Sequence, residues 1–493
     1  MTDTETETQS RSGGTLAYLI GNIIEGLFAL FFTMMLVRLI SQHDFGSWRQ
    51  FLIVFGLASN ILTFGLPKSL LYFYSISAQS EKRRIALRTL LLTIGLGTLA
   101  AAIFLIARGL IAHAWSSPAL SSYAGFFALY LFLAFPLNIF QSLLLGNDNR
   151  FMLAIWKVVF ASLRLLVLVY VLVVGGTLLN LLVAINIFAA LQLLVSLVIY
   201  LHISGRNLSN LWQGIEEQFR YSSHVTALAV SGSIAQETDK ILVSTSFSPD
   251  QFAAYSVGAR ELPLVNLFPY AISDAITPDL SRLHRDNKFA EFLNLWHSWL
   301  QRVAMIMFPL FALIVFKHEA IITLLYTRDY IAGAVPFLII GFLIPLRITS
   351  FVQILLSMNV SRAVAIGSAV HLSIIVVIGF IALKLIGFIG PALAVVLAEY
   401  IVNSYYCSQI RTHLKITWLK LFPLVFLGKT LVLSFIAAAL ANFTEVFTCD
   451  CSVFVRLLMY GCVFGMLYLL GIRILKLVSS EDIAKFKNIL LRR

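Results

Sequence analysis

The chain has 493 residues, of which 59% are hydrophobic and 12% are charged. Globular domains carry roughly 25% charged residues, so this composition excludes a soluble enzyme or binding domain and indicates a polytopic membrane protein. The formal net charge of +12 does not indicate a nucleic-acid partner, because the basic residues collect in alternate loops between apolar runs.

Apolar runs of about 20 residues recur along the chain, and each is long enough to cross a hydrocarbon layer about 30 Å thick as a helix. They predict about fourteen transmembrane helices, beginning near positions 15, 47, 86, 121, 152, 178, 223, 253, 293, 333, 364, 389, 421 and 453. Residues 1–12 are acidic and rich in Thr, unlike a signal peptide, and are expected to form a disordered tail. The predicted fold class is all-α integral membrane.

Basic residues occupy every second loop, and several of the other loops carry acids instead. The basic loops contain Lys82, Arg83 and Arg84; Arg150 and Lys157; Arg206 and Arg220; Arg282, Arg285 and Lys288; Arg411, Lys415 and Lys420; and Lys485, Lys487, Arg492 and Arg493. Cytoplasmic loops are enriched in Lys and Arg, so we expect both termini to be cytoplasmic.

The sequence repeats itself at one spacing, which indicates an internal duplication. The matching segments are "FGSW" (45–48) with "FAAY" (252–255), "FPLNIF" (135–140) with "IPLRIT" (344–349), and "QSLLLGNDNR" (141–150) with "QILLSMNVSR" (353–362). An even number of predicted spans separates the copies, so both have the same orientation in the membrane. We therefore expect two pseudo-symmetric six-helix bundles in a parallel repeat, the geometry of transporters that expose a central site alternately to each side.

The predicted domains follow from this duplication. The N-terminal lobe is residues 13–203 and the C-terminal lobe is residues 223–411. A cytoplasmic linker, 204–222, has apolar residues at helical spacing and is expected to form an amphipathic interfacial helix. Transmembrane helices 13 and 14 occupy 412–478, and 479–493 is expected to be a cytoplasmic amphipathic tail.

Several charged side chains fall inside the predicted spans, where insertion costs at least about 2.5 kcal/mol each. Those near the midplane are Glu25, Arg164, Arg302, Arg347 and Glu399. Polar residues recur on the same helix faces, so we expect these faces to line protein or water.

Three segments carry a family resemblance. They are "RLISQHDFGSWRQFLIVFGLASNILTFGL" (38–66), "ETDKILVSTSFSPDQFAAYSVGARE" (237–261) and "LLYTRDYIAGAVPFLII" (324–340). The chain resembles the Wzx-type polysaccharide flippases of the multidrug/oligosaccharidyl-lipid/polysaccharide exporter superfamily, although Ala254 stands where that family usually has Gly before Tyr255. The resemblance implies export of an undecaprenyl-diphosphate-linked oligosaccharide across a bacterial inner membrane. Membrane lipids, a polysaccharide polymerase and a chain-length regulator are the other expected partners.

A diphosphate head group suits the planar, charged fork of arginine. The residues expected to bind it in the cavity are Arg164, Arg302 and Arg347, with Lys240 and Arg260 nearer the outer side. The acids expected to couple an ion or balance charge are Glu25, Glu237 and Glu399, and Glu237 precedes Lys240 by three residues, the favourable order for a local ion pair. The alternative is that each arginine only pairs with an acid and holds helices together.

Two other functions of the same superfamily remain open, an ion-coupled multidrug antiporter and a lipid II flippase. Enzymatic function is not expected, because the sequence contains no GxxxxGK[ST] loop and no Asp-x-Asp metal motif. No metal or cofactor is expected beyond a coupling H⁺ or Na⁺. Cys449 and Cys451 lie in a predicted outward loop, and whether either forms a disulfide is left open.

Overall fold

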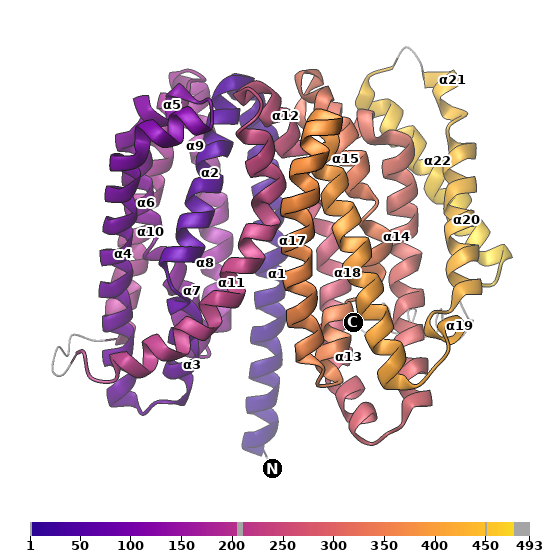
Figure 1. Ribbon diagram of the computed structural model, residues 1–493, viewed down its shortest axis with the longest axis horizontal. Coiled ribbons are helices and arrows are strands. Elements are labelled where there is room, and N and C mark those ends of the chain that lie inside the picture. Colours follow the sequence, from indigo (N-terminus) through magenta and orange to yellow (C-terminus); the bar gives the residue numbers. More distant parts are fainter. Residues whose placement is uncertain (1, 205–210, 449–450, 478–493) are drawn as a thin grey trace. The chain divides into compact units, whose positions relative to one another are not determined.

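The computed structural model describes residues 2–204, 211–448 and 451–477 (Figure 1). Regular structure in these segments is entirely helical, with no strand among them. The predicted all-α fold class is therefore confirmed. The predicted tail at 479–493 and the side chain of Cys449 lie outside the described residues, and Cys451 is an exposed free thiol.

The first half of the chain consists of helices joined by short turns. In order these are α1 (Thr2–Leu39), α2 (Gln42–Leu62), α3 (Leu66–Ile76), α4 (Gln79–Ala114), α5 (Pro118–Ser122), α6 (Ala124–Ala134), α7 (Leu137–Gly146), α8 (Arg150–Leu163), α9 (Leu165–Val174), α10 (Leu178–Ser204), α11 (Ile215–Ser244) and α12 (Pro249–Gly258). α1 begins at Thr2, so residues 2–12 are helical where the composition predicts a disordered tail. Once an apolar segment has nucleated a helix, extending it by further residues costs little.

The second half continues in the same way. Its elements are α13 (Pro263–Arg285), α14 (Phe289–Tyr326), η1 (Arg328–Gly333), α15 (Ala334–Gly341), η2 (Ile344–Ile348), α16 (Phe351–Ser357), α17 (Ser361–Ile386), η3 (Gly387–Ile389), α18 (Gly390–Leu414), α19 (Trp418–Leu421), α20 (Leu424–Ala441), α21 (Thr444–Thr448) and α22 (Val453–Ile474). Helices α20 and α22 correspond to the two predicted C-terminal spans.

A test of helix length and composition finds fewer membrane spans than the sequence predicts. Among the described residues, nine helical segments are long and apolar enough to cross a membrane, or up to eleven if each of two bent helix pairs is one span. One of the nine, residues 361–414, comprises α17 and α18, which pack against each other. The chain is thus a multi-pass membrane protein, but the predicted count of about fourteen is not confirmed.

The expected span near position 223 corresponds to α11, and the one near 253 corresponds to α12 with α13; none of these helices is among the apolar segments. α11 carries the charged run 237–240, and the last turn of α13 is basic. Charged side chains are costly against lipid, so these two helices need protein or water on their polar faces.

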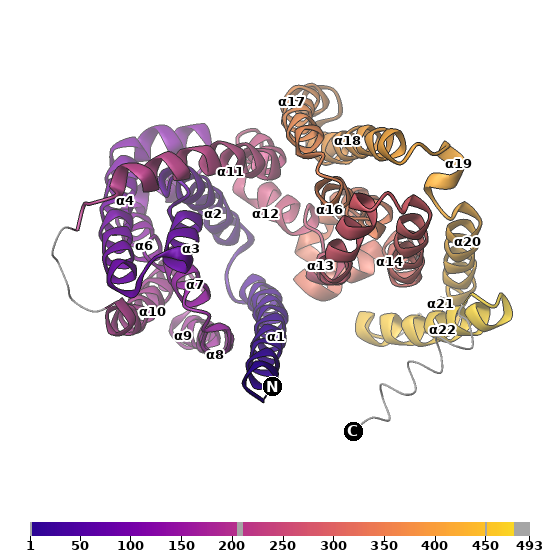
Figure 2. The same ribbon diagram turned by 90° about the horizontal axis from the view of Figure 1, so that it is seen from below.

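The chain divides into two compact units, Met1–Ser256 and Val257–Arg493. The division falls within α12, not in the predicted linker 204–222, because α11 packs against α2 and α3 of the first unit (Figure 2). The linker is not a separate helix in the part that the structure describes. Residues 211–214 form a turn, and Gly214, with φ +77°, starts α11 in a left-handed conformation that glycine adopts without strain.

Two copies of a repeated motif meet inside the first unit. The starts of α2 and α12 contain the matching segments 45–48 and 252–255, and Gln42 Nε2 donates to the Asp250 carbonyl at 3.0 Å. A Cβ on Gly46 would collide with the carbonyl of Pro249, so only glycine fits there. The starts of the two helices that carry the matching segments therefore contact each other.

Arg88 fastens the start of α11 to α4. Its side chain is 2% exposed, its Nε donates to Gln218 Oε1 at 2.9 Å, and its Nη1 donates to the Gln213 carbonyl at 2.5 Å. Gln218 Nε2 in turn donates to Thr89 Oγ1 at 2.9 Å. Arg88→Ala would leave the buried Gln218 Oε1 without its charged donor and remove the bond to the Gln213 carbonyl, and we expect it to lower the free energy of unfolding by about 2 to 4 kcal/mol.

Unfolding of the detergent-solubilised protein by heat or denaturant tests this expectation. Arg83→Ala is the matched control, because Arg83 is an exposed arginine on the same helix. Equal stability of the two variants would contradict the assignment of Arg88 as the anchor of α11.

Candidate functional site

A cavity of about 360 Å³ lies in the first unit between α1, α8 and α10. Its polar lining residues are Asn22, Glu25, Lys157, Arg164 and Gln192. The aromatic and small residues around them leave the charged groups facing a common space. The structure therefore brings two predicted site residues, Glu25 and Arg164, to one cavity.

Close packing of α1 on α8 sets the geometry of this cavity. A Cβ added to Gly21 would lie 3.1 Å from the Ala154 Cα, so the small residues let the two helices approach closely. One turn further along α1, Glu25 Oε2 accepts a hydrogen bond from Lys157 Nζ at 2.7 Å. The Lys157 side chain is 7% exposed and that of Glu25 is 41% exposed. The Glu25 charge is therefore matched by the lysine.

Arg164 stands at the break between α8 and α9. Its guanidinium carbon lies 4.7 Å from the centre of the Phe32 ring, a distance typical of cation–π contact. The Arg164 Nε is buried and has no hydrogen-bond partner among the described residues. A buried donor without an acceptor is unfavourable, so this nitrogen is suited to an anion that enters the cavity.

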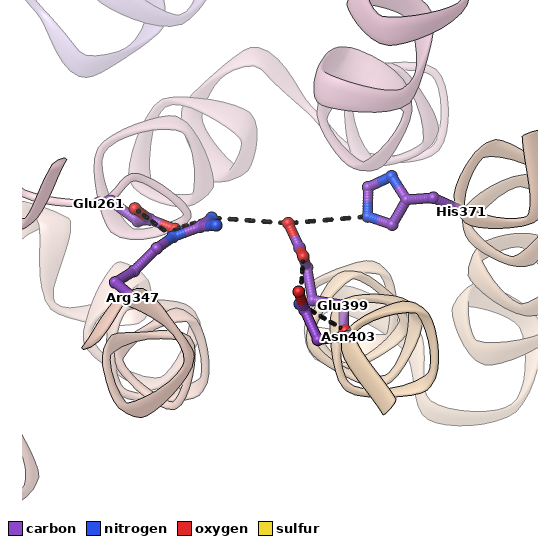
Figure 3. A network of polar contacts seen from close by, with 5 residues as sticks. All are labelled: Glu261, Arg347, His371, Glu399 and Asn403. Carbon is purple, nitrogen blue, oxygen red and sulfur yellow. Dashed lines mark hydrogen bonds and ion pairs between the residues drawn. The ribbon is translucent and has the colours of Figure 1, made fainter. Parts of the chain in front are cut away.

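The second unit holds a network of ionisable groups (Figure 3). Arg347, in η2, donates to Glu261 from Nε at 3.2 Å and from Nη2 at 2.7 Å. Its Nη2 also lies 3.5 Å from Glu399 Oε1 on α18. His371 Nε2, on α17, lies 3.8 Å from the same Glu399 oxygen, and Asn403 Nδ2 donates to Glu399 Oε2 at 3.0 Å. Two carboxylates thus face one guanidinium.

Packing of α17 against α18 positions His371, Glu399 and Asn403 of this network (Figure 3). A Cβ on Gly367 would collide with the ring of Tyr406, so glycine permits α18 to approach α17 closely. His371 lies one turn after Gly367, and Glu399 and Asn403 lie one turn apart on the facing side of α18. The contact between His371 and Glu399 follows from this packing.

A third cluster lies on α11. Lys240 Nζ is 3.2 Å from Glu237 Oε2 and 3.7 Å from Asp239 Oδ1, so the predicted local ion pair of Glu237 with Lys240 is confirmed. Asp239 is 3% exposed, and Tyr255 Oη donates to its Oδ2 at 3.1 Å. With two carboxylates beside it, Lys240 is not positioned as an unmatched cation.

A sequence profile described as polysaccharide biosynthesis protein matches residues 35–335. The chain belongs to this family. The fold is similar to that of the lipid II flippase MurJ in an inward closed conformation, with a TM-score of 0.75 and 14% identity, over 93% of this chain and 99% of that one.

Multidrug transporters share the fold less closely. An inward-facing MATE family transporter of the MOP superfamily gives a TM-score of 0.59 at 13% identity, over 81% of this chain and 96% of that one. A mutant of the MATE transporter VcmN from Vibrio cholerae gives 0.55 at 13% identity, over 84% and 99%. No curated protein sequence matches this chain. The predicted membership in a polysaccharide biosynthesis family is confirmed, and the fold is similar to those of transporters of the predicted superfamily.

The remaining predicted site residues, Arg302 and Arg260, both lie in the second unit. Arg302 is exposed on α14, and Arg260 is exposed between α12 and α13. Arg164 and Arg347 belong to different units, so their convergence on one chamber stays a prediction.

Proposed function

We propose that this protein is a flippase that moves an undecaprenyl-diphosphate-linked oligosaccharide from the cytoplasmic to the periplasmic leaflet of a bacterial inner membrane. The observation that carries the proposal is Arg164, a guanidinium beside a cavity with a buried Nε that lacks an acceptor among the described residues. Diphosphate oxygens are strong acceptors for such donors. Both termini are taken to be cytoplasmic, in line with the basic loops.

The charge of the first-unit cavity favours an anionic cargo. Lys157 and Arg164 contribute two positive charges and Glu25 one negative charge, which leaves the lining with a net charge of +1. A multidrug antiporter that carries cations needs unmatched carboxylates instead, and Glu25 is paired with Lys157. A volume of about 360 Å³ falls in the range of ligand pockets and accommodates a diphosphate with part of the adjoining sugar.

The lipid II flippase alternative shares the diphosphate carrier, so the cavity charge does not separate it from the proposal. The family match favours a polysaccharide precursor, since the matched profile describes polysaccharide biosynthesis proteins. Complementation of a strain depleted of its lipid II flippase discriminates the two. Growth rescue by this protein would support the alternative that it is a lipid II flippase.

In this proposal the ion-coupling group is the Glu399 carboxylate of the second unit. Glu399 contacts Arg347 and His371, and the two carboxylates facing one guanidinium leave a charge that a bound H⁺ or Na⁺ would balance. The membrane potential offers a further driving force. Moving one charge through 100 mV is worth about 2.3 kcal/mol, so a doubly anionic head group that leaves a negative interior gains about twice that.

Proteoliposomes test the function directly. Purified protein is reconstituted with an undecaprenyl-diphosphate-linked oligosaccharide, and exposure of the sugar to an external lectin is followed with and without an imposed voltage. We expect protein-dependent movement that accelerates when the side from which the head group departs is made negative. Export of a cationic dye without movement of the lipid-linked sugar would instead support the antiporter.

A further inference from the structure

A second cavity, of about 480 Å³, lies in the second unit, away from the Arg347 network. Residues of α14, η1, α21 and α22 line it, and helices α14, α20 and α22 pack side by side there (Figure 2). Lys317 follows Phe289, the first residue of α14, by 28 residues, or about 42 Å of helix. A hydrocarbon layer is about 30 Å thick, so the cavity lies at the membrane surface opposite the basic loop before α14. On the predicted topology this is the outer surface.

A buried lysine forms the floor of this cavity. Lys317 is 5% exposed and interrupts the helical backbone of α14, with φ −130° and ψ 17°. Its ammonium donates to Asn442 Oδ1 at 2.6 Å and to Glu445, and it lies 4.2 Å from the centre of the Tyr460 ring. These contacts join α14 to the C-terminal helices. They also match the Glu445 carboxylate, which is therefore not available to neutralise other cations.

Two arginines complete the cationic wall. Arg328 projects from η1 and Arg456 from α22, and neither side chain has a hydrogen-bond or ion-pair partner among the described residues. Glu319 is the other acid in the lining, so Lys317, Arg328 and Arg456 outweigh the two acids by one charge. Val453, the first residue of α22, also lines the cavity, and the start of a helix carries a partial positive charge.

Apolar groups lie beside these cations. Phe316, Ile331 and Leu457 line the same cavity, and Phe454 and Leu458 on α22 are exposed large hydrophobic residues. A free phosphate ion would use only the cations. A phosphate that carries a hydrocarbon chain would use both, because its chain would lie along the apolar side.

We propose that this cavity binds the phosphate group of a lipid at the outer surface of the membrane that the protein spans. Arg328 and Arg456 contact the phosphate, and Lys317 with its partners forms the base of the cavity. The site is separate from the transport cavity of the first unit. It gives the C-terminal helices a role in holding a lipid head group beside α14.

Binding to the purified full-length protein in a zwitterionic detergent tests the proposal. Short-chain phosphatidylglycerol is titrated and the melting temperature and heat of binding are recorded, with short-chain phosphatidylcholine and inorganic phosphate as comparison probes. We expect selective binding of phosphatidylglycerol, weakened about tenfold or more in the Arg328→Gln/Arg456→Gln double variant, which loses two charged donors. Arg473→Gln, an exposed arginine at the other end of α22, should bind as the wild type does.

Glu319→Gln is an independent test of the proposal. Removing a negative charge from the cavity lining should tighten phosphatidylglycerol binding by about threefold. Unchanged affinity in both the double variant and Glu319→Gln would overturn the proposal. Equal binding of phosphatidylcholine, or inorganic phosphate protecting as strongly as the lipid, would overturn it as well. The measurement involves no transport, so its failure leaves the proposed flippase function standing, and loss of flipping would leave this binding intact.

Discussion

Arg164→Gln should reduce movement of the lipid-linked oligosaccharide by about a hundredfold while leaving the protein folded. The substitution removes a charged donor group that faces the first-unit cavity. Charged hydrogen bonds contribute about 1.5 to 3 kcal/mol each, so the loss of two is worth about 3 kcal/mol, and 1.4 kcal/mol corresponds to a factor of ten. Arg164→Lys keeps the charge without the planar fork and should retain intermediate activity.

Two measurements check this result. The first is the lectin assay in proteoliposomes, and the second is the amount of lipid-linked intermediate that accumulates on the cytoplasmic side in cells. Arg108→Gln, an exposed arginine on α4 of the same unit, is the control. Wild-type surface polymer in the Arg164→Gln strain, with the variant present at normal level, would remove Arg164 from the proposed mechanism.

Arg347→Ala should strongly destabilise the second unit. Glu261 is 13% exposed and Glu399 is 20% exposed, and the change would leave both carboxylates without their guanidinium partner. Breaking a buried ion pair by removing one member costs about 3 to 5 kcal/mol, because the remaining charge is uncompensated. We expect the free energy of unfolding in mixed micelles to fall by about 3 kcal/mol.

The reason for that loss can be isolated in a double variant. Arg347→Ala/Glu261→Gln should regain part of the stability, since one of the two orphaned charges is gone. Arg362→Ala, an exposed arginine at the start of α17, serves as the control and should behave as the wild type. A double variant no more stable than Arg347→Ala would show that charge pairing is not the source of the effect.

The structure favours different roles for Arg164 and Arg347. The sequence left two roles open for each predicted arginine, binding a diphosphate or pairing with an acid. Arg347 makes a two-pronged contact with Glu261, which favours the alternative that it holds helices together. Arg164 instead has a buried donor without an acceptor among the described residues. Residue count along the predicted helices places both near the midplane, and that depth stays a prediction. Their partners could not be predicted from the sequence.

The residues missed by sequence reasoning are those whose importance depends on a neighbour. The sequence places Lys157 on the helix face that leads to Arg164, seven residues or two turns further on, but does not identify its partner Glu25. Glu261 and His371 had no comparable signal. Each becomes part of a site only because η2, α17 and α18 bring Arg347 and Glu399 beside it.

Local packing also explains where the predicted domain boundary differs from the structure. The polar stretch at 204–222 suggests a linker between lobes, but Gln218 is hydrogen-bonded to Arg88 and α11 packs on the first unit. A polar sequence does not reveal whether its side chains face water or a buried arginine on another helix.

The amino-acid sequence alone is enough to identify an all-helical, multi-pass membrane protein with an internal duplication. It could do so because hydrocarbon excludes unpaired backbone groups, which leaves long apolar helices as the solution for such a composition. Which charges are matched becomes known only from the folded arrangement of the helices. Lys157 and Glu25 stand 132 residues apart in the chain, and Arg347 and Glu261 stand 86 apart. Pairing depends on distances between helices that are remote in sequence. Packing at small residues sets some of these distances, as at Gly21 between α1 and α8 and at Gly367 between α17 and α18.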